Sequence, residues 1–185
     1  MPYSNVLELE ACLDDCIRYC EEHPDAEYAK LFVDRLKKTR RDWYRSVELS
    51  DEQHRRWRTE QRQGRIAWKK LAHDLREVQR ELRRVGAIDF PNVRVMYWDE
   101  DRLLAVIEAM RGYLAEHADD LEFAGEFLER FDRNLGVASS EEREANNALK
   151  DYQRVVDLRR ATMNDISADI REFRIALRRA LGRLL

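Results

Sequence analysis

Apolar residues recur along two long stretches of the chain at alternating spacings of four and three residues. The first stretch covers residues 57–85 and the second covers residues 152–177. This spacing, kept over about four heptads, is typical of a coiled-coil seam and predicts two long amphipathic helices. Each seam is interrupted once, by Gly64 and by Arg159. A glycine destabilises the interior of a helix, so Gly64 suggests that a bulky group approaches the helix there.

Helix-start signals divide each half of the chain into three predicted helices. Asn5 and Ser50 are expected to begin two helices of the first half, and Asp99 and Ser139 two helices of the second. Pro24 suits the first turn of the second helix. The predicted helices cover residues 5–22, 26–46 and 51–85, and then about 100–117, 120–135 and 140–183.

The two halves of the chain resemble each other, which indicates an internal duplication. Residues 9–25 align with residues 103–119 at an offset of 94, and a Tyr-x-x-Glu-His sequence recurs in both. One residue is gained after this stretch, and residues 75–84 align with residues 170–179 at an offset of 95. Chance similarity between two amphipathic helical stretches is the competing explanation.

These patterns predict an all-α fold, an elongated antiparallel bundle of two duplicated long helical hairpins. In each hairpin, the first two helices form a kinked pair that packs along the third, coiled-coil-like helix. The hairpins cover residues 1–85 and 100–185. An apolar packed linker at 86–99 is expected to cross one end of the bundle, and residues 93–97 could form a short strand. A compact three-helix unit is the alternative, and whether the chain kinks or turns fully after residue 22 stays open.

Composition places the chain among folded helical proteins. Charged residues make up 38% and hydrophobic residues 44% of the chain, and with 6 glycines and 3 prolines the loops must be few. The first residues lack a secretory signal, and no apolar run is long enough to span a membrane. The three cysteines fall in one predicted helix, unlike a secreted disulfide framework. We therefore expect a cytoplasmic protein.

The net charge of −3 conceals four alternating blocks of charge. Residues 1–34 carry a net charge of −7, residues 35–84 of +9, residues 96–151 of −9 and residues 152–185 of +4. The first basic block contains aromatic residues among its arginines, a composition found on surfaces that bind phosphate or protein.

The candidate binding surface is the part of this basic block around the predicted turn between the second and third helices, within residues 37–70. Its members are basic or aromatic, and they are Lys37, Lys38, Arg40, Arg41, Trp43, Tyr44, Arg45, Arg55, Arg56, Arg58 and Arg62. The corresponding part of the second half is acidic, so a duplicated fold does not require these charges. Ion pairing between the block and the acidic first helix is the alternative explanation.

Candidate ligands for a metal are few. Cys12, Cys16 and Cys20 form a stripe that could hold a soft metal ion, but the aligned residues of the second half are apolar, so we interpret the cysteines as core residues. Glu-His pairs recur at 22–23 and 116–117, where a histidine suits the end of a helix. No phosphate-binding loop, nucleophile elbow or zinc-protease motif is present. The sequence thus predicts no catalytic residue, no metal and no cofactor.

The leading functional hypothesis is a non-enzymatic interaction or scaffold protein that binds another protein, or itself as a homodimer, through a helical surface. A binder of nucleic acid or of an anionic membrane surface, acting through the basic block, is the second hypothesis. A metal-holding bundle that uses the cysteine stripe is the third.

Overall fold

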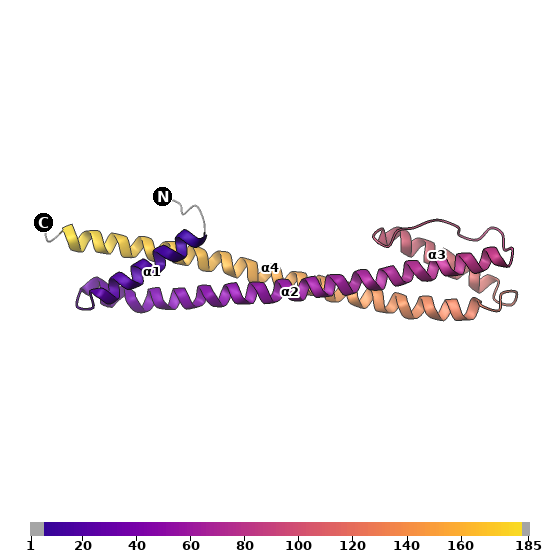
Figure 1. The fold of residues 1–185 in the computed structure, drawn as a ribbon, viewed down its shortest axis with the longest axis horizontal. Helices are drawn as coiled ribbons and strands as arrows, with labels where there is room; N and C mark the ends of the chain where they lie inside the picture. Colours follow the sequence, from indigo (N-terminus) through magenta and orange to yellow (C-terminus); the bar gives the residue numbers. More distant parts are fainter. Residues whose placement is uncertain (1–5, 183–185) are drawn as a thin grey trace. The chain divides into compact units, whose positions relative to one another are not determined.

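The computed structural model describes residues 6–182, and this part of the chain is all-α, without a strand. Its helices are α1 (Val6–Glu22), α2 (Glu27–Arg84), α3 (Glu100–Glu116) and α4 (Ala124–Gly182) (Figure 1). The all-α prediction is therefore confirmed for residues 6–182, and the short strand considered at 93–97 is absent. The predicted helix start at Asn5 and the last residue of the predicted final helix lie outside the described residues.

The turns predicted in the middle of each half are wrong, because α2 and α4 are single helices of 58 and 59 residues. α2 passes through residues 46–51 without a break, and α4 passes through residues 135–140. Ser50 and Ser139 are thus interior helix residues and not helix starts. Asp99 does occupy the N-cap position of α3, although its side chain makes no capping hydrogen bond.

Buried hydroxyl residues explain why α2 continues. Leu36, Thr39, Trp43, Ser46 and Ser50 are all buried and follow the same three-four spacing as the apolar seam further along the helix. Two of the hydroxyl groups have identified acceptors, since Thr39 donates to Asp169 of α4 (2.6 Å) and Ser46 to the carbonyl of Trp43 (2.7 Å). These polar residues resemble a helix-start signal in the sequence, but they continue the seam.

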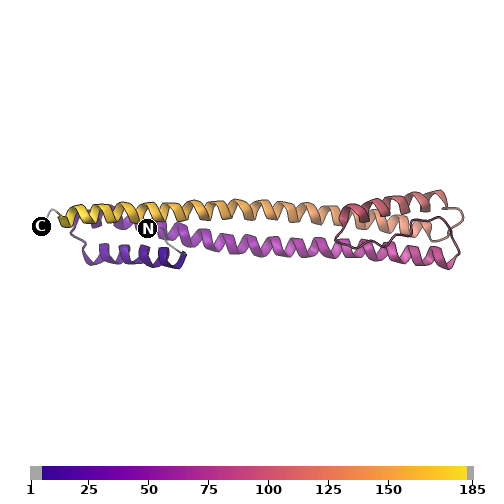
Figure 2. The ribbon, with the colours of Figure 1, turned by 90° about the horizontal axis from the view of Figure 1, so that it is seen from above.

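The contacts divide the chain into two units, which we describe separately. Unit 1 combines Met1–His54 with Asp151–Leu185, and unit 2 is Arg55–Lys150. Each unit contains one short helix and a part of each long helix, with the parts of α2 and α4 packed together (Figure 2). Three helical segments per unit agree with the alternative of a three-helix unit, but one segment of each comes from the other half of the chain. The domain boundaries predicted from the repeat stay a prediction; they are 1–85, 86–99 and 100–185.

In unit 1, α1 turns back fully along α2 instead of forming a kinked pair with it. Glu21 contacts Lys37 (2.7 Å) and Asp14 contacts Arg40 (3.1 Å), so residue numbers fall along α1 as they rise along α2. The core between these helices and α4 is apolar. Its largest members include Leu9, Leu13, Ile17, Leu36, Trp43, Ile166, Ile170 and Phe173. Burial of each such aliphatic side chain stabilises the unit by about 1.5–3 kcal/mol.

In unit 2, α3 runs in the same direction as α2. Glu100, at the start of α3, lies near Gly64, and Tyr113, near its end, lies near Val85. α3 covers the predicted seam of α2. The buried residues of α2 and α3 here are Leu71, Leu75, Val78, Leu82, Leu103, Ile107, Met110 and Leu114.

The linker between α2 and α3 returns along unit 2. The prediction that it crosses one end of the bundle is therefore wrong. The side-chain amide of Gln79 donates to the carbonyls of Pro91 (2.9 Å) and Val93 (3.2 Å), and Val95 is buried. The reason is topological: because α3 runs in the same direction as α2, the chain must travel back along the helix before α3 can begin.

A buried carboxylate anchors α4 to α2 in unit 2. Asp74 is 2% exposed, and Arg130 donates to it at 2.6 Å and to Glu77 at 2.6 Å. Asn134 also donates to Asp74. The hydrogen bond from Arg130 lowers the pKa of Glu77.

An equivalent cluster occurs in unit 1. Arg35 pairs with Asp169 and, at 2.7 Å, with Glu172, while Thr39 donates to Asp169 at 2.6 Å. Each of these residues stands 95 positions from its counterpart in the cluster around Asp74. The same contacts therefore recur at positions that the predicted alignment pairs.

We expect Arg130→Met to destabilise the protein by about 3 kcal/mol, because it leaves Asp74 buried without its cation. Arg35→Met should destabilise it by a similar amount, about 2–3 kcal/mol, because it leaves Asp169, whose side chain is 8% exposed, without its cation. Denaturant unfolding at neutral pH measures both. Because the folded-state pKa of Glu77 lies below its ordinary value, the contribution of Glu77 to stability is complete at neutral pH and is lost as the pH falls. A cost below about 1 kcal/mol for either variant would contradict the role given to these two buried aspartates.

We expect Gly64→Ala to raise stability by up to about 1 kcal/mol through helix propensity. A Cβ built at Gly64 meets nothing within 4 Å, so the bulky group expected from the sequence is not there. Thermal unfolding measures the effect, and Gly112→Ala in α3, where the space is equally open, serves as the comparison. A lower melting temperature for Gly64→Ala alone would mean that the glycine serves a purpose other than close packing.

Candidate electrostatic binding surface

The predicted binding residues do not surround a turn, because all of them lie within α2. Seven belong to unit 1, from Lys37 to Arg45, and four belong to unit 2, from Arg55 to Arg62. The two groups are therefore considered separately.

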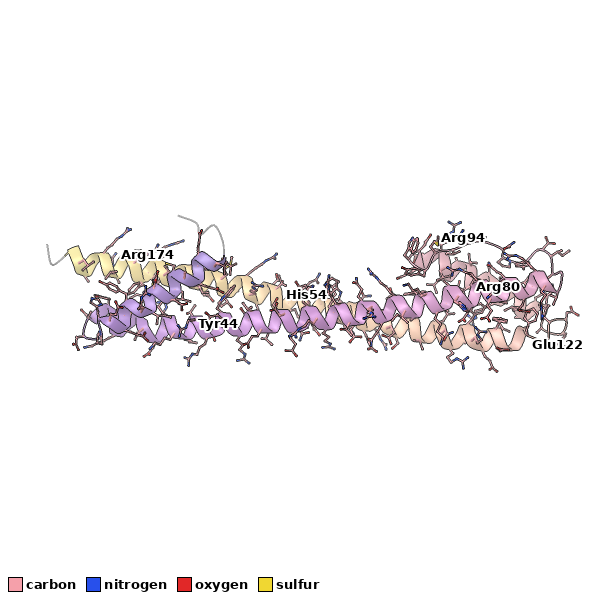
Figure 3. The ribbon with its side chains drawn as sticks, viewed as in Figure 1. Tyr44, His54, Arg80, Arg94, Glu122 and Arg174 are labelled. Atoms are coloured by element: carbon pink, nitrogen blue, oxygen red, sulfur yellow. The ribbon has the colours of Figure 1, made fainter. Side chains whose placement is uncertain are left out.

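In unit 1, part of the predicted set belongs to internal packing. Lys37 and Arg40 form the ion pairs with α1 described above. Trp43 is 1% exposed, its indole N–H donates to Glu10, and the guanidinium of Arg159 lies 5.3 Å from its ring centroid. Lys37 and Arg40 therefore agree with the ion-pair alternative, and Trp43 belongs to the core. The remaining members, Lys38, Arg41, Tyr44 and Arg45, are exposed (Figure 3 labels Tyr44).

In unit 2, the basic residues form a longer surface than the sequence had suggested. Arg55 and Arg56 are exposed but take part in contacts within the chain. Arg58 and Arg62 begin a row of seven exposed basic residues, which we call the basic stripe. The stripe consists of Arg58, Arg62, Arg65, Lys69, Arg76, Arg80 and Arg83.

Successive residues of the stripe are three, four or seven positions apart, which places them on one face of α2. At about 1.5 Å per residue the stripe is about 38 Å long. The seam residues Leu71 and Leu75 lie on a different face. The stripe therefore takes no part in covering the apolar seam.

Carboxylates do not neutralise the stripe. Within residues 6–182, none of its seven members has an ion pair, whereas three of the four acidic residues of the same helical segment are paired with other arginines. Asp74 and Glu77 bind Arg130, and Glu81 pairs with Arg84 at 2.9 Å. One stripe residue, Lys69, lies over the ring of Tyr97, 4.9 Å from its centroid.

At its C-terminal end the stripe borders a hollow of about 650 Å³ between α2 and the returning linker. Three stripe residues, Arg76, Arg80 and Arg83, line it from the helix, and Arg94 lines it from the linker. Figure 3 labels Arg80 and Arg94 on these two elements. The other lining residues are His73, Leu75, Gln79, Asn92, Val93 and Val95. We call this site the arginine hollow.

The arginine hollow was not predicted from the sequence. The spacing of Arg76, Arg80 and Arg83 by four and three residues is visible in the sequence and marks one helix face. The approach of Arg94 is not visible, because it depends on the return of the linker along α2.

The cysteine stripe belongs to the core. Cys16 and Cys20 are buried, and Arg174 donates to Cys12 Sγ at 2.9 Å. Burial, followed by the neighbouring Cys12, raises the pKa of Cys16 to about 12. A thiol with so high a pKa stays protonated, which is unfavourable for metal binding.

The two Glu-His pairs stand at helix ends. His23 Nδ1 lies 3.1 Å from the carbonyl oxygen of Tyr19, and the two rings stack with centroids 4.5 Å apart. His117 repeats this arrangement with Tyr113, at 2.9 Å and 4.3 Å. These contacts give each histidine a structural role.

Two further groups bring potential metal ligands within 4.8 Å of one another. One contains His73, Asp74 and Glu77, but both of its carboxylates already bind Arg130. The other, Glu60, Glu141 and Glu144, consists of carboxylates only, and such groups are common without a metal.

These observations define a class of protein: an all-α chain with two long helices packed together, carrying an unneutralised basic stripe. Comparison of the chain with protein-family models, curated proteins and solved structures finds no match. None of the helices within residues 6–182 is both long and apolar enough to cross a membrane.

We expect Cys12 to react with a thiol reagent before Cys16 and Cys20 in the folded protein. The raised pKa of Cys16 lowers its thiolate fraction roughly a thousandfold relative to an ordinary cysteine, and Cys20 is 1% exposed. Labelling followed by peptide mass spectrometry measures the order, and guanidinium-unfolded protein, in which all three should react together, is the control. Rapid native labelling of all three, or one bound zinc or copper per chain, would revive the metal hypothesis.

Proposed function

We propose that the protein is a non-enzymatic, cytoplasmic interaction or scaffold protein that binds an acidic surface of another protein, a second copy included, through the basic stripe. The observation that carries this proposal is the row of seven exposed basic side chains without an ion pair among the described residues. The three cysteines all lie on α1 and form no disulfide within residues 6–182, which is compatible with a reducing compartment.

Folding alone does not account for the stripe. Like charges along one face repel one another, and a surface that serves only solubility carries both signs interspersed. Six of the seven stripe residues are arginines, whose planar guanidinium groups bind carboxylates through two hydrogen bonds and are enriched at protein interfaces. A surface that recognises carboxylates of a partner protein is therefore expected to carry arginine in preference to lysine.

We also propose that the chain arose by tandem duplication, and this bears on the stripe. The recurrence of the Arg35 cluster as the Arg130 cluster, 95 residues later, supports duplication. The stripe does not recur. The residues 95 positions after its members are Gln153, Asp157, Arg160, Asn164, Arg171, Ile175 and Arg178. Only three of these seven residues are basic and one is acidic, so the proposed repeat does not require the full row of charges, which supports a function specific to the stripe.

The charge distribution of unit 2 favours an acidic protein over nucleic acid. Residues 55–84 carry a net charge of +7, whereas residues 85–150 carry −8. A stiff DNA duplex would extend from the stripe over the acidic part and be repelled there, whereas a compact acidic surface or a flexible acidic chain can contact the stripe alone. The acidic part of a second copy is one such surface, so self-association is the simplest form of the proposal.

To test the proposal, we would replace Arg58, Arg62 and Arg65 by glutamine. These arginines lie outside the arginine hollow and form no ion pair, so the melting temperature should change little. Binding to poly-L-glutamate at low salt should weaken at least tenfold, and any salt-sensitive self-association in sedimentation should be lost. The matched control replaces Arg171, Arg178 and Arg179, three exposed arginines of α4, and should bind as wild type does.

Two results would overturn the proposal. One is equal binding by the stripe variant and the control variant. The other is a wild-type chain that stays monomeric and does not bind poly-L-glutamate. Tighter binding to duplex DNA or to phosphatidylserine vesicles than to poly-L-glutamate, with a steep loss as salt rises, would replace the protein partner with a nucleic acid or a membrane surface.

A further inference from the structure

We infer that the arginine hollow of unit 2 binds a phosphate monoester, a doubly charged group attached to a small organic body. The inference rests on the proposed function only in part, since Arg76, Arg80 and Arg83 belong to the basic stripe while Arg94 does not. It also requires no protein partner.

Cations converge on the hollow from two separate elements. Arg76, Arg80 and Arg83 lie on successive turns of one helix face, and Arg94 lines the hollow from the linker. No aspartate or glutamate is among the lining residues, and Arg76, Arg80 and Arg94 form no ion pair within residues 6–182. An anion in the hollow would therefore meet cations from two elements and no carboxylate among the lining residues.

The number of cations favours a phosphate over a carboxylate. A carboxylate offers two oxygens and one negative charge, which a single arginine can satisfy. A phosphate monoester carries a charge of about −1.5 to −2 at neutral pH and has three acceptor oxygens, enough for two or more guanidinium groups. It thus offsets more of the mutual repulsion among the four arginines.

The size and lining of the hollow indicate that the phosphate carries an organic group. A volume of about 650 Å³ falls in the range of small-molecule sites and far exceeds the volume of a bare phosphate ion. Leu75 and Val95 are at most 4% exposed, so the apolar contacts come from Val93, which is 40% exposed, and from the carbon chains of the arginines. The organic body would pack on these side chains while the phosphate binds the guanidinium groups.

The linker side of the hollow is held in place by hydrogen bonds. Gln79 is 5% exposed, and its amide nitrogen donates to the carbonyls of Pro91 and Val93, on either side of Asn92. Asn92 accepts in turn from Arg83. Arg94 therefore projects from a fixed segment, so a ligand need not order the linker before it binds.

The phosphate monoester could be free or belong to a phosphorylated side chain, and two titrations of the full chain distinguish these sources. Isothermal calorimetry with glycerol 3-phosphate examines a free ester. A phosphoserine heptapeptide with glycine and serine around the phosphoserine, set against the same peptide without phosphate, examines the side chain. A preference of at least tenfold for one of them identifies the source, and equal affinities assign the phosphate group itself as the determinant.

The decisive variant is Arg94→Gln, because Arg94 is exposed and lies outside both the helices and the stripe. We expect one binding site per chain in the wild type and at least a tenfold weaker affinity in Arg94→Gln and in Arg80→Gln. Helicity and melting temperature without ligand should stay unchanged. The control Arg171→Gln, 95 positions after Arg76 and in unit 1, should bind as wild type does.

The triple variant at Arg58, Arg62 and Arg65 separates this inference from the proposed function. It should lose poly-L-glutamate binding and keep phosphate binding, while Arg94→Gln should behave in the opposite way. The inference is overturned if the wild type binds neither ester at 10 mM, or if Arg94→Gln binds them as tightly as the wild type does. Equal binding of sulfate and glycerol 3-phosphate would also overturn it, since the organic body would then contribute nothing.

Discussion

The structure depends on covering the apolar seams of two helices that are each nearly 60 residues long. An amphipathic helix of this length gains little stability from propensity and must bury its apolar face against other segments. In unit 2 the cover comes from α3 and the first part of α4, and in unit 1 from α1 and the last part of α4. Each short helix has 17 residues, so it covers only the part of α2 within its own unit.

Two buried aspartates constrain how the long helices align within this apolar packing. Asp74 in unit 2 and Asp169 in unit 1 are at most 5% exposed, and a buried carboxylate is costly unless cations and donors surround it. Arg130 and Asn134 satisfy the first, and Arg35 and Thr39 satisfy the second. A shift of α4 along α2 by one turn would keep much of the apolar contact but would leave the aspartate without its arginine. We therefore infer that these clusters fix the register that the apolar seams leave loosely defined.

The sequence predicted what depends on periodicity and missed what depends on contacts across the chain. The helical class and the seam from Trp68 to Leu82 follow from apolar spacing and were confirmed. The turn near Ser50 was wrong because a serine can begin a helix or occupy a buried seam, and only the facing helix decides between the two. Trp43 looked like a surface aromatic among arginines, yet Glu10 and Arg159 enclose it from distant parts of the chain.

The arginine hollow follows from the same constraint as the fold. To cover the seam of α2 in unit 2, α3 must begin near Gly64 and end near Val85, so the linker has to travel the length of α3 in the opposite direction. Gln79 holds that returning segment against the helix, and Arg94 is thereby brought to a face that already carries three arginines. A linker crossing the end of the bundle would have left the basic stripe convex along its whole length. The return of the chain gives one end of the stripe a second wall, and with it the concave shape that a small anionic ligand requires.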